Sequence, residues 1–474
     1  MGVNSDAAAV YGHKLSTVVP GSVSGETVVH ELADMDLVMK LHYVRTVYYF
    51  QQSETVDGLT IVDLKKPMFR WLTSYYPVTG RIRRTEAGRP LVKCNDCGVR
   101  IVEANCCRTL EEWLQVPHSA RWRPLVPDKV LGPDLRFSPM VYVQVILSLT
   151  YLNVSSYSSM TSGLYLLIPR FIIFFSCGLV FSCEQFTKFQ CGGMAIGYSW
   201  SHVLGDPVAG TNCINLWGQL LAGNPPPKSL LPHSARTPTA RPARQPPVSA
   251  TPLSVKQVEP AGDLWLIADA CKMATDSITI TESRLKHMQS EKLNSVPAFE
   301  MISALFWHCL ASVRRGGREP RVVTICRHKP RAKKCAELSN EQMISTVSTS
   351  HASPADLDLA ELALLVSKQK VDETTLVEES IDGDGGKPDF VVYGANLTFV
   401  DMEGVDLSGL DIKDEKPVQV DSVIDGVGDE GAVLVFPQGA DAGGGSKGAA
   451  AVLILPEDQI LKLREVLKRE FDIA

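Results

Sequence analysis

The sequence of 474 residues lacks the features that mark several classes of protein. The first thirty residues hold no basic stretch followed by an apolar run, so we expect no secretory signal. A mean hydropathy of +0.02 is too low for a multi-span membrane protein. The 35 Gly and 29 Pro are close to ordinary usage, which excludes collagen-like and wholly disordered chains. The net charge of −6 lacks the basic excess of nucleic-acid-binding proteins, so no nucleic-acid partner is expected.

Several chemical motifs are also missing. The 12 cysteines are scattered and form no disulfide framework, which indicates a reducing compartment. Cys94 and Cys97 have a zinc-like spacing, but the adjacent Cys106 and Cys107 would diverge in a strand, so we predict thiols and no metal site. No GxSxG motif is present, which argues against a covalent acyl-enzyme.

Apolar periodicity predicts strands and helices on both sides of one linker. Residues 222–255 are rich in Pro, Ser and Thr and have no apolar period, which is typical of an extended crossover. The segments predicted with most support are a strand over 44–50, a helix over 63–76, two strands within 90–104, and helices over 295–310 and 456–471. We therefore predict two α/β domains, 1–221 and 256–474.

Residues 145–185 interrupt this pattern. This segment contains only Arg170 and Glu184 as charges, and its removal joins two strand-like pieces into one alternating strand, VYVQ-FTKFQCGG. The segment begins with Val, whose codons start with GT, and ends with Gln, which CAG can encode. A retained intron read in frame would have these boundaries. A membrane-inserted hairpin or helix and an ordinary surface insertion are the alternatives.

One constellation has mechanistic weight, namely His202 followed four positions later by Asp206. A histidine at the end of a buried strand, turning at Gly205, can act as a general base toward a hydroxyl or an amine. A core histidine with an Asp that caps a helix is the other interpretation of the same residues.

The flanking sequence resembles the BAHD acyltransferase family over nearly the whole chain. The matching pieces are Met35-Asp36-Leu37, Tyr76-Pro77-Val78-Thr79-Gly80-Arg81, Cys94-Asn95-Asp96 with Gly98, His202 with Asp206, the segment from Pro297 to Trp307, and Ala395-Asn396-Leu397-Thr398-Phe399. The resemblance implies two similar α/β domains, as in chloramphenicol acetyltransferase, with a channel between them. It implies acyl-CoA as substrate, no metal or prosthetic group, His202 as general base, and Asp206 as structural support paired with an Arg, for which Arg327 is the candidate. No residue is assigned to CoA binding.

The second signature of that family, Asp-Phe-Gly-Trp-Gly followed by Lys-Pro, is degraded here. The matching register holds Asp411-Ile412-Lys413-Asp414-Glu415 before Lys416-Pro417, so both glycines and both aromatic residues are gone. Loss of Gly-Trp-Gly removes backbone freedom and adds charge at what the resemblance makes the channel wall. This departure argues against ordinary acyl-CoA turnover.

The same departure points to one branch of the family. The stretches 35–45, 393–401 and 426–437 look like the plant eceriferum/glossy wax proteins. For that branch the resemblance implies an accessory role in very-long-chain acyl elongation at the cytosolic face of the endoplasmic reticulum, beside an elongase condensing enzyme. Cytosol is the alternative location, and contact with membrane would come through the partner or through residues 145–185.

Two functional hypotheses follow, besides a product unable to fold because its insertion breaks a strand. The first is the accessory role, which needs no proton transfer at His202. The second is a catalytic acyl-CoA-dependent O- or N-acyltransferase with His202 as base. That chemistry needs an oxyanion donor, for which Ser199 and Thr398 are candidates, although structural roles fit both.

Overall fold

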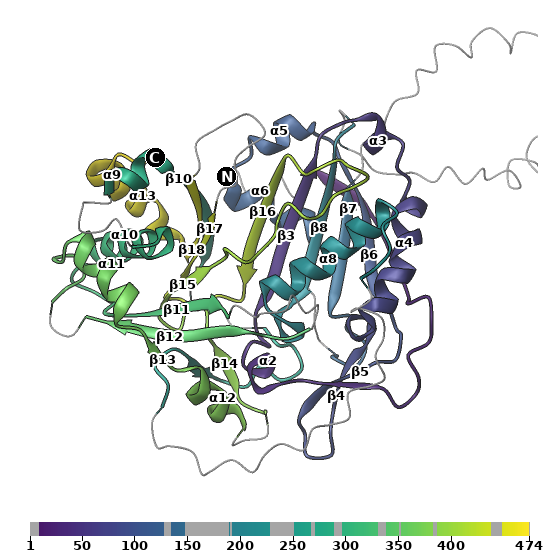
Figure 1. Cartoon of the computed structure of the whole chain (residues 1–474), viewed down its shortest axis with the longest axis horizontal. Helices are drawn as coiled ribbons and strands as arrows, with labels where there is room; N and C mark the ends of the chain where they lie inside the picture. The colour runs from purple at the N-terminus through teal and green to yellow at the C-terminus, as the bar shows by residue number, and fades with distance from the viewer. Residues whose placement is uncertain are drawn as a thin grey trace, which may run out of the picture.

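The chain consists of two α/β halves placed side by side in the computed structural model (Figure 1). The structure describes residues 9–127, 134–146, 189, 192–227, 251–266, 271–288, 296–329, 338–349, 352–382, 386–437 and 448–473. Each half is built on one large mixed sheet and also carries a small one: β2–β5–β4 (Val29–Glu31, Pro90–Lys93, Arg81–Arg84) in the N-terminal half and β14–β9 (Asp389–Val391, Lys256–Val258) in the C-terminal half. Among the described residues, no helix is long and apolar enough to cross a membrane.

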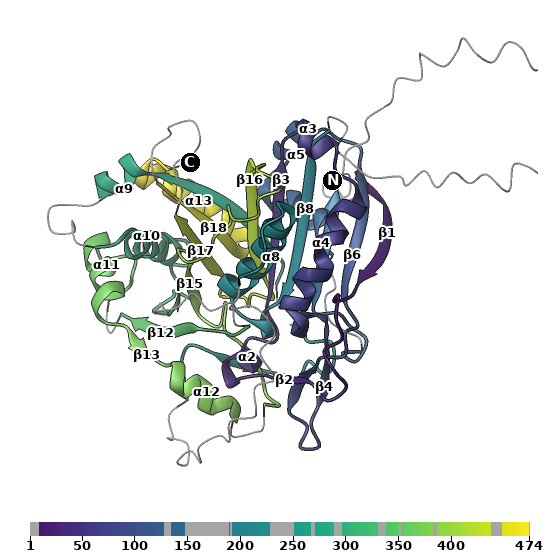
Figure 2. The same cartoon turned by 45° about the vertical axis from the view of Figure 1, so that its right-hand side comes forward.

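The N-terminal sheet has six strands in the order β1–β6–β7–β8–β3–β16. Their bounds are Val10–Val18, Val99–Cys106, Val141–Ile146, Met194–Ser201, Tyr43–Phe50 and Gln419–Asp425. The helices α4 (Ile61–Ser74) and α8 (Pro207–Leu221) pack against each other beside this sheet (Figure 2). Trp71 of α4 donates to the carbonyl of Cys213 at 2.7 Å, and Trp217 of α8 donates to that of Leu64 at 3.0 Å. These crossed bonds satisfy both indole N–H groups inside the core.

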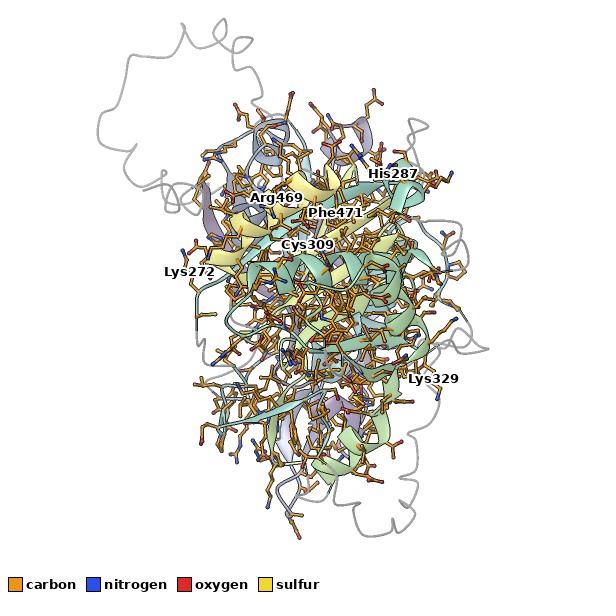
Figure 3. All side chains as sticks on the ribbon, turned by 90° about the vertical axis from the view of Figure 1, so that its left-hand side faces the viewer. Lys272, His287, Cys309, Lys329, Arg469 and Phe471 are labelled. Carbon is orange, nitrogen blue, oxygen red and sulfur yellow. The ribbon has the colours of Figure 1, made fainter. Side chains whose placement is uncertain are left out.

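The C-terminal sheet has seven strands in the order β10–β18–β17–β15–β11–β12–β13. Their bounds are Met273–Thr281, Gly448–Pro456, Ala432–Pro437, Leu397–Asp401, Val322–His328, Gln342–Ser348 and Val371–Asp372. The helices on its outer face are α9 (Glu282–Met288), α10 (Ala298–Val313), α11 (Leu359–Lys368) and α13 (Glu457–Phe471), as Figure 3 shows. One apolar cluster, which includes Leu305, Leu310 and Leu467, fills the space between these helices and the sheet. The prediction of two α/β units of this fold class is therefore confirmed.

The strand β16 belongs by sequence to the C-terminal half, yet it pairs with β3 at the edge of the N-terminal sheet. Asp421 on β16 accepts two hydrogen bonds from the guanidinium of Arg121 on α6 (His118–Arg121), at 2.7 and 2.8 Å. It also accepts one from the hydroxyl of Tyr49 on β3, at 2.9 Å. Because both charges are almost fully buried, each needs the other, and the pair fixes β16 in the first sheet.

The predicted elements lie where the periodicity placed them. The strand β3 is buried over its whole length, and the bounds of α4 lie close to those of the predicted helix. Helix α4 begins at Ile61 behind a capping box of Thr60 and Asp63, so Pro67 is an interior residue. The earlier start of the first turn moves the proline to the helix centre.

The residues on either side of the anomalous segment, at the end of β7 and just before β8, show how the two strands pair. In the antiparallel ladder of β7 and β8, Ile146 faces Ala195, so position 148 would face Gly193. Phe189 bonds to that residue: its N–H donates to the Gly193 carbonyl at 3.3 Å, and its own carbonyl accepts from Gly192 at 3.0 Å. The offset from position 148 to Phe189 equals the length of the segment 145–185. Residues 147–188 lie outside the described part of the chain. The register favours the interpretation that an inserted segment as long as 145–185 separates β7 from Phe189.

Candidate functional site

His202 lies at the junction of the two halves, and the strand before it determines its position. Every residue of β8 is buried, and a short 3-10 turn, His202–Leu204, follows directly. Gly205 then adopts φ +152°, and a Cβ there would lie 2.7 Å from the Cβ of Ala209 and 3.0 Å from the Ser339 carbonyl oxygen. Only glycine fits this turn, which lets the chain leave the strand and begin α8.

Asp206 is the N-cap of α8 and joins the two halves. Its Oδ1 accepts from the N–H of Ala209 at 3.0 Å. Its Oδ2 accepts from the N–H of Glu341 at 3.1 Å and lies 3.0 Å from Nδ1 of His328. The carboxylate therefore has helix-capping and bridging partners, and the Nε2 of His202 bonds to another residue, Tyr393.

The expected pairing of Asp206 with Arg327 was wrong. Arg327 forms ion pairs with Glu300 and Asp401, each at 3.0 Å, and its neighbour His328 contacts Asp206 instead. Both residues lie on β11, where successive side chains point to opposite faces of the sheet. A shift of one position therefore decides which of the two faces the N-terminal half.

The side chain of His202 is enclosed, with 0% of its surface exposed. Its Nε2 lies 3.0 Å from the hydroxyl oxygen of Tyr393, and that hydroxyl donates to Oε1 of Gln342 at 2.5 Å. Nε2 of His202 is therefore engaged in a hydrogen bond with Tyr393, in which either atom can be the donor. This bond and the enclosure leave no room for a substrate atom at Nε2.

Two further residues complete the surroundings of His202. His42 lies with its ring centroid 6.4 Å from that of His202 and 4.7 Å from that of Tyr393, so the two imidazoles flank the phenol. The carbonyl of His42 accepts from the N–H of His202 at 3.0 Å. Asn340 donates to the carbonyl of His202 at 2.9 Å and to Oδ1 of Asp36 at 2.9 Å. The predicted motif residue Asp36 therefore supports the site through Asn340.

Burial dominates the titration of these groups. It lowers the pKa of His202 to about 4 and that of His42 to about 3, and it raises that of Asp36 to about 6. Burial also raises the pKa of the Tyr393 hydroxyl well above its ordinary value. At neutral pH both histidines are therefore neutral and Tyr393 is protonated, which is the state that the hydrogen bonds require.

The degraded second signature forms an exposed turn. Ile412 and Glu415 exchange backbone hydrogen bonds at 3.0 and 3.1 Å across Lys413 and Asp414, whose φ angles are +52° and +74°. A hairpin turn with both central residues left-handed normally uses Asn-Gly or Gly-Gly. Lys413 and Asp414 point to solvent, so the added charge predicted for a channel wall is on the surface, while Ile412 is buried.

The remaining candidate residues have local partners. Ser199 is fully buried and accepts from Nη1 of Arg45 at 3.0 Å. Thr398 accepts from the N–H of Gly394 at 3.0 Å and donates to the Asn396 carbonyl at 2.8 Å. Cys94 is buried whereas Cys97 is exposed. Within the described ranges, no group of three or more His, Cys, Asp or Glu side chains is arranged to hold a metal ion.

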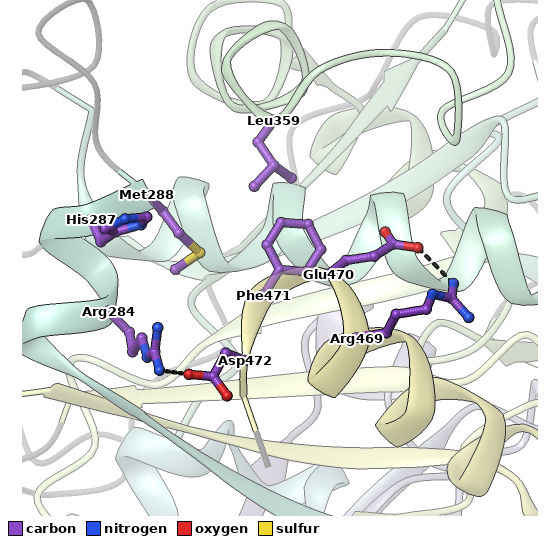
Figure 4. Close-up of a pocket in the computed structure, with 8 residues that line it drawn as sticks. All are labelled: Arg284, His287, Met288, Leu359, Arg469, Glu470, Phe471 and Asp472. Carbon is purple, nitrogen blue, oxygen red and sulfur yellow. Dashed lines mark hydrogen bonds and ion pairs between the residues drawn. The ribbon is translucent and has the colours of Figure 1, made fainter.

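A cavity of about 440 Å³ lies elsewhere, among α9, α11 and α13 of the C-terminal half (Figure 4). Its apolar lining is Met288, Leu359 and Phe471. Its charges are paired, Arg284 with Asp472 and Arg469 with Glu470. The cavity holds none of the residues that the sequence singled out.

Sequence reasoning missed Tyr393, Gln342, Asn340 and His328. His42 and Tyr393 lie inside stretches that carry the family resemblance, so a signal existed for them, but no pattern told which residue of each stretch would meet His202. Asn340 and Gln342 come from a polar stretch with no period. Their role depends on how the two halves meet, which local sequence does not report.

The profile of the Transferase family matches residues 10–153 and 180–469. The chain belongs to this family, the BAHD acyltransferases. The match leaves out residues 154–179, which lie within the anomalous segment. Protein ECERIFERUM 26-like of Arabidopsis thaliana is 35% identical over 97% of this chain and 96% of that protein. Protein ECERIFERUM 2 of the same plant is 33% identical over 97% and 98%. The resemblance to the eceriferum wax-biosynthesis branch is thereby confirmed.

The solved structure of vinorine synthase has the same fold. Its TM-score is 0.67 at 16% identity, and the comparison covers 97% of this chain and 98% of that one. This similarity shows that the two chains share the two-domain α/β fold. Members of the family use acyl-CoA as substrate.

Proposed function

We propose that this protein is an accessory factor of cuticular wax biosynthesis that promotes very-long-chain acyl elongation together with an elongase condensing enzyme. Its ligand on this proposal is an acyl-CoA or its acyl chain. The observation that carries the proposal is the enclosed state of His202, with 0% exposure and Nε2 already hydrogen-bonded to Tyr393. A general base must reach the proton it removes, and this imidazole reaches only its neighbours.

Two further observations support an accessory role. The second signature of the family is replaced by a solvent-exposed turn at Lys413 and Asp414. The relatives that are 33% and 35% identical to this chain over nearly its full length are eceriferum proteins. A protein that retains the family fold without an available base is suited to binding an acyl group or a partner.

Acyl-chain profiling in a heterologous host that expresses a plant condensing enzyme tests the proposal. The arms are no addition, the full chain, His202→Ala, and His202→Gln as a variant that fills the same space with a neutral side chain. We expect longer acyl chains with the full chain and with every variant that accumulates as folded protein. Absence of lengthening with the full chain would refute the accessory role.

The catalytic acyltransferase is the second candidate, because His202 and Asp206 are both retained. Lengthening that disappears in His202→Gln while the variant stays folded would favour it.

For location we propose the cytosolic face of the endoplasmic reticulum, with cytosol as the alternative. Cell fractionation with and without the condensing enzyme distinguishes them, since a protein held only through its partner would leave the membrane fraction without it.

A further inference from the structure

The phenol of Tyr393 lies where a substrate hydroxyl would have to lie in order to be deprotonated by His202. The hydroxyl oxygen is 3.0 Å from Nε2, within the distance that general-base catalysis requires between a base and its substrate. Tyr393 is fully buried and lies two residues after β14. The centroid of its ring lies 5.6 Å from that of His202 and 4.7 Å from that of His42, so the ring packs against both imidazoles.

Gln342 sets the direction of the hydrogen bond. It is the first residue of β12, and its Oε1 accepts the Tyr393 proton at 2.5 Å. The hydroxyl oxygen then offers only lone pairs to His202, so the imidazole is held as the Nε2–H tautomer. His42 has the opposite tautomer, because its Nε2 accepts from the N–H of Val392 at 3.1 Å. The two imidazoles therefore have fixed and different protonation patterns on either side of one phenol.

We propose that Tyr393 is an internal ligand of His202, which occupies the place of an acceptor hydroxyl and withholds the imidazole from acyl transfer. Tyr393 is thus a positioning residue that keeps a retained His202 inactive. The inference rests on the proposed function in one respect, that the native chain works without proton transfer. It adds that an acyltransferase centre is latent and that one side chain blocks it.

The blocked reaction has a simple balance. An alcohol would give its proton to Nε2 of His202 while its oxygen forms the new ester bond to the acyl carbon. The C–S bond of the acyl-CoA would break, and the leaving CoA thiolate would take the proton from the imidazolium. With Tyr393 present, Nε2 already carries hydrogen and the space of the alcohol is filled.

The tautomer is the decisive measurement. Long-range ¹H–¹⁵N spectra of the histidine-labelled full chain at pH 7 would identify His202 by comparison with His202→Gln. We expect Nε2–H in the native chain and a shift toward Nδ1–H in Tyr393→Phe. The control is Tyr198→Phe, which removes a buried hydroxyl from β8 and should leave the His202 tautomer unchanged. An Nδ1–H form in the native chain, or no change in Tyr393→Phe, would overturn the proposal.

Thiol release from palmitoyl-CoA in the presence of hexanol tests the latent chemistry. We expect Tyr393→Ala to exceed the native rate by about a hundredfold, the usual scale of general-base assistance, and Tyr393→Ala/His202→Gln to return to the native rate. A folded Tyr393→Ala without increased thiol release would refute the claim that Tyr393 is what withholds the base. Failure of acyl lengthening by the native chain would refute the proposed function and would leave these two readouts intact.

Discussion

Removal of the surplus segment from the connection between β7 and β8 should leave the N-terminal sheet in register. A deletion of residues 147–187 keeps every described residue of β7 and brings Phe189 to the place of position 148, opposite Gly193. Residues 147–193 separate the two strands, and only 188–193 would remain between them after the deletion. Each doubling of loop length raises the free energy of loop closure by about 0.6 kcal/mol. The deletion shortens the loop by roughly three halvings, so the free energy of unfolding should rise by about 2 kcal/mol.

The matched control removes one residue fewer, 147–186. Phe189 would then move one place along the ladder and to the opposite face of the sheet. Phe189 is fully buried with its ring 6.2 Å from that of Trp113, so its exposure costs about 2–3 kcal/mol and cancels the gain. Urea unfolding followed by tryptophan fluorescence gives both free energies. Equal stability of the two deletions would refute the register argument.

The transcript supplies an independent check of the retained-intron hypothesis. Amplification across this region should give a product that lacks the codons for residues 145–185 if the segment is an intron. Uniform inclusion of the segment in the transcript would refute the hypothesis, while the stability difference between the two deletions would still hold.

Three further predictions concern stability. Because burial lowers the pKa of His202 to about 4, only the unfolded chain gains a proton there between pH 6.5 and pH 4. The unfolding free energy of the native chain should thus fall by about 3 kcal/mol more than that of His202→Gln as pH falls across this window, measured by urea titration. Asp421→Asn should cost about 3–5 kcal/mol by the same assay, and a cost below about 1 kcal/mol would contradict the role given to its pair with Arg121. Asp414→Gly should raise the unfolding free energy by about 1 kcal/mol, whereas Glu415→Gly should not.

Local pattern predicted the elements of the fold because burial on one face or both leaves a period in the sequence. The strand β3 is buried along its whole length, and Leu64, Met68 and Trp71 of α4 are buried at helical spacing. The sequence predicted the motif from His202 to Asp206. It left open whether His202 is a general base or a core histidine followed by a helix-capping Asp, because the answer depends on the residues around it. The cap that Asp206 provides to α8 was one of those interpretations.

The contacts between the halves were not predictable in the same way. Arg327 and His328 are neighbours in sequence, and only the packing of β11 decides which one reaches Asp206. Tyr393 and Gln342 reach the site of His202 from distant positions in the C-terminal half of the chain. Such meetings depend on the assembled tertiary structure, and a single sequence holds no periodic trace of them.

The pairing of β16 with β3 has a consequence for synthesis. The first sheet receives its edge strand from residues 419–425 of a chain of 474, so it stays incomplete until nearly the whole polypeptide has left the ribosome. During that interval the open side of β3, a strand with no exposed residue in the finished protein, offers unpaired backbone groups to any extended segment nearby. A nascent chain of this protein therefore has reason to engage chaperones late, and truncated products that end before β16 should aggregate where the full chain does not.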